Sequence, residues 1–119
     1  MRLLDSNIII YGIQTAYAYL SPLFYESDSY ISEITKLEVL GYHKFDAISK
    51  QDMTELFDSL KIILIDSTII GEAVELRQLR RMSIGDAIIA ATAIIKDCEI
   101  LSRNTSDFRG LGITVSNPV

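Results

Sequence analysis

The feature that most constrains the fold of this chain is the segment Ser83–Ile95, in which a helix-start signal precedes an almost unbroken apolar run. Asp86 follows Ser83 by three positions. At this spacing the serine oxygen caps a free backbone N–H, and the acid lies at the positive end of the helix. The residues after Asp86 are almost all alanine or isoleucine. The sequence therefore predicts a helix that holds an ionised carboxylate at the edge of a hydrophobic core.

Length and composition indicate how many domains to expect and where the protein resides. With 119 residues, 49% of them hydrophobic, the chain can form one compact domain with a sizeable core, and we expect residues 1–119 to be that domain. The longest apolar run, Ala87–Ile95, is far shorter than the roughly 20 residues that span a bilayer. The apolar N-terminus is interrupted at Asp5, too early for a secretory signal. We predict no transmembrane helix and a cytoplasmic location.

Several kinds of chemistry have little support in the sequence. Cys98 is the only cysteine, which excludes an internal disulfide and a cysteine-based zinc site, and we expect it to be a small buried residue near a helix end. His43 is the only histidine, so a Ser-His-Asp or Cys-His mechanism has a single possible base. The net charge of −5 argues against broad electrostatic capture of nucleic acid. It is compatible with a nuclease whose acids are neutralised by a metal ion.

Short strand-like segments alternate with helical segments along the chain. The continuous run Lys61–Ile65 is typical of a strand buried on both faces. A second capping-box spacing, Thr35 to Glu38, predicts another helix start. Strands separated by helices imply a parallel sheet covered on both faces. The expected strands are Leu3–Asp5, Tyr30–Ser32, Lys61–Ile65, Cys98–Ser102 and Ile113–Val115.

Four acids fall where such a sheet binds its ligands. In an open parallel sheet this place lies beyond the carboxyl ends of the strands, where the strand order reverses. Asp5 ends the first expected strand, and Asp107 follows the fourth. Glu38 lies one helical turn beyond the second strand, and Asp86 opens the helix that leads to the fourth. We expect all four carboxylates to face one crevice.

Each acid also has a purely structural explanation, as a cap or a turn former, but such residues point in any direction, whereas these four share one end of one sheet. Two unit charges about 4 Å apart repel by roughly 4 kcal/mol at an effective dielectric constant near 20. A gathered set must therefore protonate, separate or bind a metal ion. Oxygen ligands without cysteine or several histidines suit Mg²⁺ or Mn²⁺, which support phosphoryl chemistry.

Four segments of the chain resemble the signature segments of PIN-domain ribonucleases, particularly the VapC-type toxins of bacterial and archaeal toxin–antitoxin pairs. The segments occur in the family's order, and the tail Gly110–Pro118 is similar to the family's last strand. The resemblance implies an α/β fold, a three-layer α/β/α sandwich with a central parallel sheet of about five strands. It also implies Mg²⁺- or Mn²⁺-dependent endonucleolytic cleavage of RNA that leaves a 5′ phosphate. The matching segments are Leu3–Tyr11, Ile34–Tyr42, Ser83–Ala93 and Leu101–Phe108.

The same resemblance assigns roles to individual residues. Ser6 and Ser102 stand where the family often has threonine, and the Ser6 hydroxyl is expected to orient Asp5 or a metal-bound water. Asn104 matches the family's amide near the metal. The implied catalytic and metal-binding residues are Asp5, Glu38, Asp86 and Asp107.

Basic residues near these segments are candidates for contacts with RNA phosphates, although each also fits a solvated surface or a helix C-terminus. With so few cations, we predict selective recognition of a structured RNA, such as a tRNA or rRNA loop. The candidates are Lys36, Arg77, Arg80, Arg81, Arg103 and Arg109.

The sequence also suggests protein partners. Tyrosines at positions 11, 17, 19, 25, 30 and 42 either complete the surface of the core or expose a patch for pairing. Similar toxins form homodimers and are blocked by an antitoxin that lays a hydrophobic helix on the toxin and often places a basic residue among the acids. The resemblance therefore implies a homodimer and a cognate antitoxin here, with charge complementarity at the acidic pocket.

Two other functions remain as alternatives. A phosphoacceptor domain of the receiver type also binds Mg²⁺ at a strand-end aspartate, but it needs an early pair of acids, and here Asp5 is followed by Ser6 and Asn7. Such a domain also needs a lysine after a late strand, where this chain has Arg103 and Asn104. A catalytically silent PIN-like binding module would keep the fold without the activity, and the presence of all four acids weighs against it.

Overall fold

A computed structural model describes residues 1–41 and 47–119, so His43 and Tyr42 lie outside the described residues. Short strands alternate with helices throughout these two ranges. The elements in chain order are β1 (Arg2–Leu4), α1 (Ser6–Gly12), the 3-10 helix η1 (Thr15–Tyr25), β2 (Ser29–Ser32), α2 (Glu33–Leu40), α3 (Ala47–Asp58), β3 (Ile62–Ile63), α4 (Ser67–Leu79), α5 (Ile84–Lys96), β4 (Glu99–Leu101), the 3-10 helix η2 (Thr105–Phe108) and β5 (Val115–Ser116).

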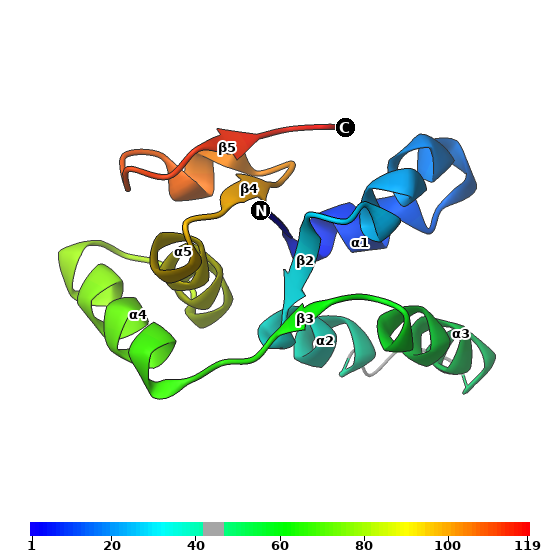
Figure 1. The fold of residues 1–119 in the computed structure, drawn as a ribbon, viewed down its shortest axis with the longest axis horizontal. Coiled ribbons are helices and arrows are strands. Elements are labelled where there is room, and N and C mark those ends of the chain that lie inside the picture. The colour runs from blue at the N-terminus through cyan, green and yellow to red at the C-terminus, as the bar shows by residue number, and fades with distance from the viewer. Residues whose placement is uncertain (42–46) are drawn as a thin grey trace.

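The strands form one parallel sheet in the order β3-β2-β1-β4-β5. β1 pairs with both β2 and β4, so the strand order reverses at β1. Helices α4 and α5 cover one face of the sheet, and α1 and α3 lie on the other (Figure 1). The predicted parallel α/β/α sandwich is confirmed.

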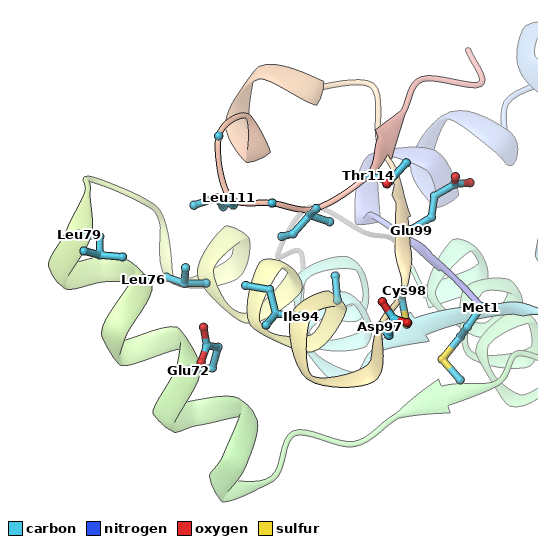
Figure 2. A pocket seen from close by; sticks show the side chains of 14 residues that line it. Met1, Glu72, Leu76, Leu79, Ile94, Asp97, Cys98, Glu99, Leu111 and Thr114 are labelled. Carbon is cyan, nitrogen blue, oxygen red and sulfur yellow. The ribbon is translucent and has the colours of Figure 1, made fainter.

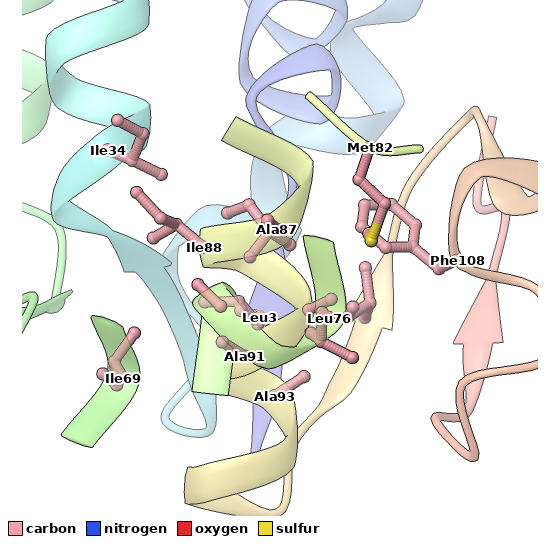
Figure 3. Close-up of a cluster of buried hydrophobic side chains, with 14 of the residues drawn as sticks. Leu3, Ile34, Ile69, Leu76, Met82, Ala87, Ile88, Ala91, Ala93 and Phe108 are labelled. Carbon is pink, nitrogen blue, oxygen red and sulfur yellow. The ribbon is translucent and has the colours of Figure 1, made fainter. Parts of the chain in front are cut away.

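Alternate residues of the central strands supply the two halves of the core. Leu3 of β1 and Ile100 of β4 pack on one side with α4 and α5, whereas Leu4 and Leu101 pack on the other with α1 and α3. Figure 3 shows Leu3 among the alanines of α5, with Leu76 of α4 close by. Because seven consecutive residues of α5, from Ala87 to Ala93, are buried, this helix is held firmly between the sheet and α4.

The predicted cap of α5 is confirmed, whereas the predicted cap of α2 is wrong. The Ser83 hydroxyl oxygen accepts a hydrogen bond from the Asp86 backbone N–H at 3.0 Å. In α2 the capping residue is Ser32, whose hydroxyl oxygen accepts from the Ile34 N–H at 3.2 Å. β2 leads directly into α2, so Thr35 is already inside the helix and is fully buried.

The strand predicted over Lys61–Ile65 exists, but its extent and its environment were wrongly predicted. β3 spans only Ile62–Ile63 at the edge of the sheet, where both residues are half-buried, and Leu64 is 66% exposed. An apolar run indicates that a segment contributes to the core, but it does not indicate whether the strand pairs with another strand on each side. Strand order decides that, and β3 pairs with β2 alone.

The expectation for Cys98 is confirmed. Cys98 is buried, and burial raises the pKa of its thiol, so the side chain remains a protonated small apolar group. Within the described residues, the helices are all too short or too polar to cross a membrane.

Candidate active site

Asp5 lies at the point where the strand order of the sheet reverses. It is only 6% exposed, and it caps α1, because one carboxylate oxygen, Oδ1, accepts a hydrogen bond from the Ser6 N–H at 2.8 Å. The other oxygen, Oδ2, accepts from the Ser102 hydroxyl at 2.8 Å. The Asp5 N–H donates to the Leu101 carbonyl at 2.9 Å. These contacts join the carboxyl ends of β1 and β4 around a single buried carboxylate.

Asn7 completes this network, although sequence analysis did not identify it as a site residue. Its side-chain nitrogen lies 3.3 Å from both Asp5 Oδ2 and the Ser102 hydroxyl oxygen, and its Oδ1 accepts from the Arg103 N–H at 3.1 Å. Its signal in the sequence is an amide side chain two positions after an acid that ends a strand. Asn7 therefore links two segments that are far apart in the sequence.

The three predicted supporting residues contribute in different ways. Ser102 is fully buried and bonds Asp5 directly, whereas the Ser6 hydroxyl lies 3.5 Å from Asp5 Oδ1. Asn104 takes part through its main chain, because its N–H donates to the Ser102 hydroxyl oxygen at 3.0 Å, and the residue itself is exposed. The hydroxyl of Ser102 is consequently fixed by several partners.

The remaining acids come from three other segments. Glu38 of α2 lies against the first turn of α5, where a Cβ atom added to Gly85 would be only 2.9 Å from Glu38 Oε2. The adjacent residue, Asp86, is half-buried in that same turn. Asp107 is an exposed residue of η2. The glycine before Asp86 thus lets the carboxylate of Glu38 approach α5 closely.

The four acids influence one another electrostatically. Burial raises the pKa of Asp5 most, hydrogen bonds from Ser102 and Ser6 lower it, and the charge of Asp107 raises it further. Burial also raises the pKa of Glu38, with added repulsion from Asp5 and Asp86. The pKa of Asp86 is raised first by burial and then by the charges of Asp107 and Asp5. Carboxylates from four separate segments therefore share one local electrostatic environment.

These carboxylates have no ionic partner in residues 1–41 and 47–119, where the ion pairs are those of Arg2 with Glu26 and Asp28. In the same two ranges, no three acidic, histidine or cysteine side chains are gathered tightly enough to form a ready-made metal site. The available donors are all oxygens of the kind that Mg²⁺ and Mn²⁺ bind. The donor chemistry therefore fits these ions, while ligation requires the carboxylates to draw closer together.

A pocket of about 650 Å³, which we call the arginine-lined pocket, is lined by two of the acids and three of the predicted cations. Within it, the Arg77 side chain donates to the Met82 carbonyl at 3.1 Å. The other predicted cations do not line this pocket: Lys36 is exposed on α2, Arg109 is exposed after η2, and the Arg103 guanidinium lies 4.7 Å from the ring centre of Tyr11. The lining residues are Arg77, Arg80, Arg81, Met82, Ser83, Asp86, Ser106 and Asp107.

A larger pocket of about 760 Å³ lies elsewhere and contains none of the predicted site residues. It is bounded by α4, the C-terminal end of α5 and residues 110–114 (Figure 2). Glu99, at the start of β4, lines it, whereas Asp5 follows the end of β1. Because β1 and β4 are parallel, this pocket lies at the amino ends of the strands, whereas the acids lie at their carboxyl ends.

The fold and the site together define a class of protein, an α/β/α sandwich that gathers carboxylates where a parallel sheet reverses its strand order. The PIN domain family model matches residues 2–112, and the chain belongs to this family. A comparison with curated proteins finds no match.

Solved structures extend this assignment. The chain is 32% identical to a protein in a toxin–antitoxin complex from Klebsiella pneumoniae, with a TM-score of 0.83 and coverage of 100% of this chain and 98% of that one. It shares its fold with FitAcB from Neisseria gonorrhoeae (23% identity, TM-score 0.80, coverage 99% and 98%). It also shares it with VapBC2 from Rickettsia felis bound to a DNA fragment from their promoter (20% identity, TM-score 0.78, coverage 98% and 97%). The predicted resemblance to VapC-type PIN toxins is confirmed.

Proposed function

We propose that this chain is a divalent-metal-dependent endoribonuclease and the toxin of a toxin–antitoxin pair. The observation that carries the proposal is that Asp5, Glu38 and Asp86 each have a pKa raised by burial and by the charge of another of the four acids, and that none of the four has an ionic partner in the described part of the chain. A set of this kind is stabilised by a cation. Membership of the PIN family supports the same function.

The four carboxylates are the groups that would hold Mg²⁺ or Mn²⁺. When bound, such an ion supplies an activated water and neutralises charge on the phosphodiester. Glu38 and Asp107 are the more exposed members, so their side chains have the freedom to move toward an ion near Asp5 and Asp86. Asp5 provides a fixed reference, because its two oxygens are already oriented by Ser6 and Ser102.

The residues around the acids suit an RNA substrate. The arginine-lined pocket places positive charge beside Asp86 and Asp107, which favours the approach of a phosphate to a cluster that would otherwise repel it. Because the chain has a net charge of −5, we propose that binding depends on the shape of a structured RNA, such as a tRNA or rRNA loop.

A cognate antitoxin is the proposed partner. An apolar groove of about 410 Å³ runs between α4 and α5 and shares Arg77 with the arginine-lined pocket. Its side chains include Ile70, Val74 and Ile84, which are 45%, 51% and 61% exposed. A hydrophobic antitoxin segment in this groove would continue into the acidic site and block it. The solved complex from Klebsiella pneumoniae supports this type of partner.

Three further predictions belong to this proposal. We expect residues 1–119 to act as one domain, in the cytoplasm, as a homodimer. Tyr19 and Tyr25 of η1 are 59% and 60% exposed and are candidate contacts between two copies. Sedimentation equilibrium of the wild type and of a Tyr19→Ser variant tests the dimer, which would be excluded by a monomeric mass at all concentrations.

The nuclease proposal is tested by incubating purified protein with total cellular RNA in Mn²⁺ or in EDTA. We expect endonucleolytic cleavage in Mn²⁺ only, and its loss in Asp5→Asn, because the amide cannot supply the anionic ligand. The matched control is Asp52→Asn, which changes an exposed aspartate of α3 and should cleave like the wild type. Cleavage that persists in EDTA or in Asp5→Asn would contradict the proposal.

Further arms of this experiment distinguish the other functions. A folded tRNA should be cut faster than a homopolymer, and equal rates would overturn the proposed selectivity. Labelling of Asp5 by a small phosphodonor would indicate the phosphoacceptor alternative, and RNA binding without cleavage would indicate the silent module. Co-expression with the product of an adjacent small reading frame should give a stable, inactive complex, and free, active protein would argue against an antitoxin.

A further inference from the structure

Arg80 connects the end of α4 to the segment that carries Asp107. Its Nη2 donates a hydrogen bond to the Asp107 main-chain carbonyl at 2.6 Å, and its Nη1 donates to the carbonyl of Arg109. The two acceptors flank Phe108, the buried side chain of η2. One guanidinium therefore holds the backbone on both sides of the residue that anchors this turn.

Two backbone hydrogen bonds also hold this turn, from the Asp107 N–H to the Asn104 carbonyl at 3.1 Å and from the Arg109 N–H to the Ser106 carbonyl at 3.3 Å. η2 is a 3-10 helix of four residues, and the side chain of Asn104 does not cap it. The next two glycines, Gly110 and Gly112, have φ values of 81° and 74°. Glycine adopts this backbone region readily, whereas most other residues avoid it. Hydrogen bonds from a charged donor are roughly twice as strong as neutral ones, and the planar guanidinium also fixes their direction. Arg80 thus adds charged side-chain support to the backbone at Asp107.

The neighbouring arginine has a different environment. Arg81 lines the same pocket, but in the described part of the chain its side chain makes no hydrogen bond or ion pair, and the residue is exposed. Arg80 and Arg81 therefore carry equal charge at adjacent positions, while only Arg80 is engaged by the protein itself. This contrast provides an internal control.

We propose that Arg80 is a positioning residue that fixes the Asp107 carboxylate through its two main-chain carbonyl contacts, while Arg81 contacts substrate phosphate. The inference rests on the proposed function, because Asp107 needs a fixed position only if it acts with the other acids. It assigns different tasks to two residues that sequence alone treats as equivalent.

The test compares Arg80→Ala, Arg80→Lys and Arg81→Ala by three measurements. The first is Mn²⁺ affinity without RNA, from the loss of the free-ion electron paramagnetic resonance signal. The second is the single-turnover cleavage rate at saturating RNA. The third is the RNA dissociation constant and its salt dependence, measured in the Asp5→Asn background so that the RNA stays intact.

For Arg80→Ala we expect Mn²⁺ affinity and the cleavage rate to fall by about 10- to 100-fold, as for other residues that orient metal ligands, with a smaller loss of RNA affinity than in Arg81→Ala. Arg80→Lys should behave similarly, because an ammonium group keeps the charge but not the two-pronged geometry. Arg81→Ala should keep its Mn²⁺ affinity, weaken RNA binding and reduce the slope of log K against log salt by roughly 0.7 to 0.9.

Other outcomes overturn the inference. If Arg80→Lys restores full activity, or if Arg80→Ala weakens RNA binding with unchanged Mn²⁺ affinity, Arg80 is a phosphate contact. If Arg80→Ala equals an active wild type in all three measurements, Arg80 is a surface residue and only this inference fails. A wild type that neither binds Mn²⁺ nor cleaves RNA overturns the proposed function and this inference with it. Should Arg80→Ala fail to fold by circular dichroism, Arg80→Lys decides the result.

Discussion

At the scale of single residues, folding buries carboxylates of the site and brings them near one another, which disfavours their ionised form. Asp5 is buried and its pKa is raised, yet hydrogen bonds from Ser102 and Ser6 act in the opposite direction and favour its ionised form. Glu38 has a raised pKa through burial and through repulsion by Asp5 and Asp86. The metal-free fold therefore carries an electrostatic cost at neutral pH that is concentrated in these side chains.

Glu38→Gln should therefore stabilise the metal-free protein. Because the folded-state pKa of Glu38 lies above its ordinary value of 4.5, the native state binds the proton more tightly than the unfolded state does. Its contribution to stability is unfavourable above the raised pKa and disappears as the pH falls below 4.5. In EDTA we expect a higher melting temperature for Glu38→Gln at pH 7, with a difference that shrinks toward pH 4.

The control for this comparison is Glu75→Gln, which changes an exposed glutamate of α4. Its melting temperature should follow that of the wild type across the pH range. A Glu38→Gln variant that is less stable than the wild type at pH 7 would contradict the electrostatic account.

Where the four acids lie in the fold could be predicted from the sequence, because they stand at strand ends and helix starts, whereas their catalytic role stays a prediction. Ser102 was also predicted. Asn7 was missed, and Asn104 contributes through its N–H instead of its side chain. Asn7 was missed because side-chain contacts between segments 95 positions apart leave no local pattern in a single sequence. The Asn104 N–H contact is local, but it depends on where the Ser102 hydroxyl points, which the contact with Asp5 sets.

At the scale of elements, the first turn of α5 must serve both a helix and a neighbouring carboxylate. Ser83 caps the helix, and Gly85 leaves the space that Glu38 occupies. Local patterns predicted the helix and its cap well, since both depend on near neighbours in the sequence. They failed for β3, and for Thr35 in α2, because strand order and the join between β2 and α2 are set by tertiary packing.

Gly85→Ala should separate stability from activity. An alanine in a helix lowers the entropy of the unfolded chain, which stabilises a compatible site by about 0.4–1 kcal/mol. The new Cβ would lie 2.9 Å from Glu38 Oε2, so the carboxylate must move away. We expect an unchanged or higher melting temperature together with a loss of cleavage of about 100-fold, the order associated with a misplaced catalytic group.

Gly71→Ala on α4 is the matched control, because nothing lies within 4 Å of a Cβ built there. It should raise the melting temperature without changing cleavage. Equal activity of Gly85→Ala and Gly71→Ala would show that the position of Glu38 is unimportant.

At the scale of the whole molecule, the sheet brings distant acids together. Strand order 3-2-1-4-5 places the ends of β1 and β4 side by side, while α2 and α5 bring Glu38 and Asp86 to the same edge. The general behaviour of parallel sheets predicts such a convergence from the sequence, and in the described residues the acids affect one another's pKa although no three of them form a tight group. The arginine-lined pocket was not predicted as a unit, because it depends on how the end of α4 meets η2.

Divalent ions should consequently stabilise the entire fold. An ion that binds only the native state adds RT ln(1 + [L]/Kd), or about 2.7 kcal/mol at 100 times Kd, which amounts to several degrees of melting temperature. Thermal melts with and without Mn²⁺, at matched ionic strength, should show this shift in the wild type and not in Asp5→Asn. An equal shift in both proteins would point to binding elsewhere.

The sheet ends on each side in a strand of two residues, β3 and β5. Edge strands this short expose few unpaired backbone groups, so they are poor templates for a strand from another chain, which is a common route to aggregation of β-sheet proteins. The two ends of the sheet therefore disfavour backbone pairing with another chain, which leaves the side chains on the helices as the larger surface for recognition.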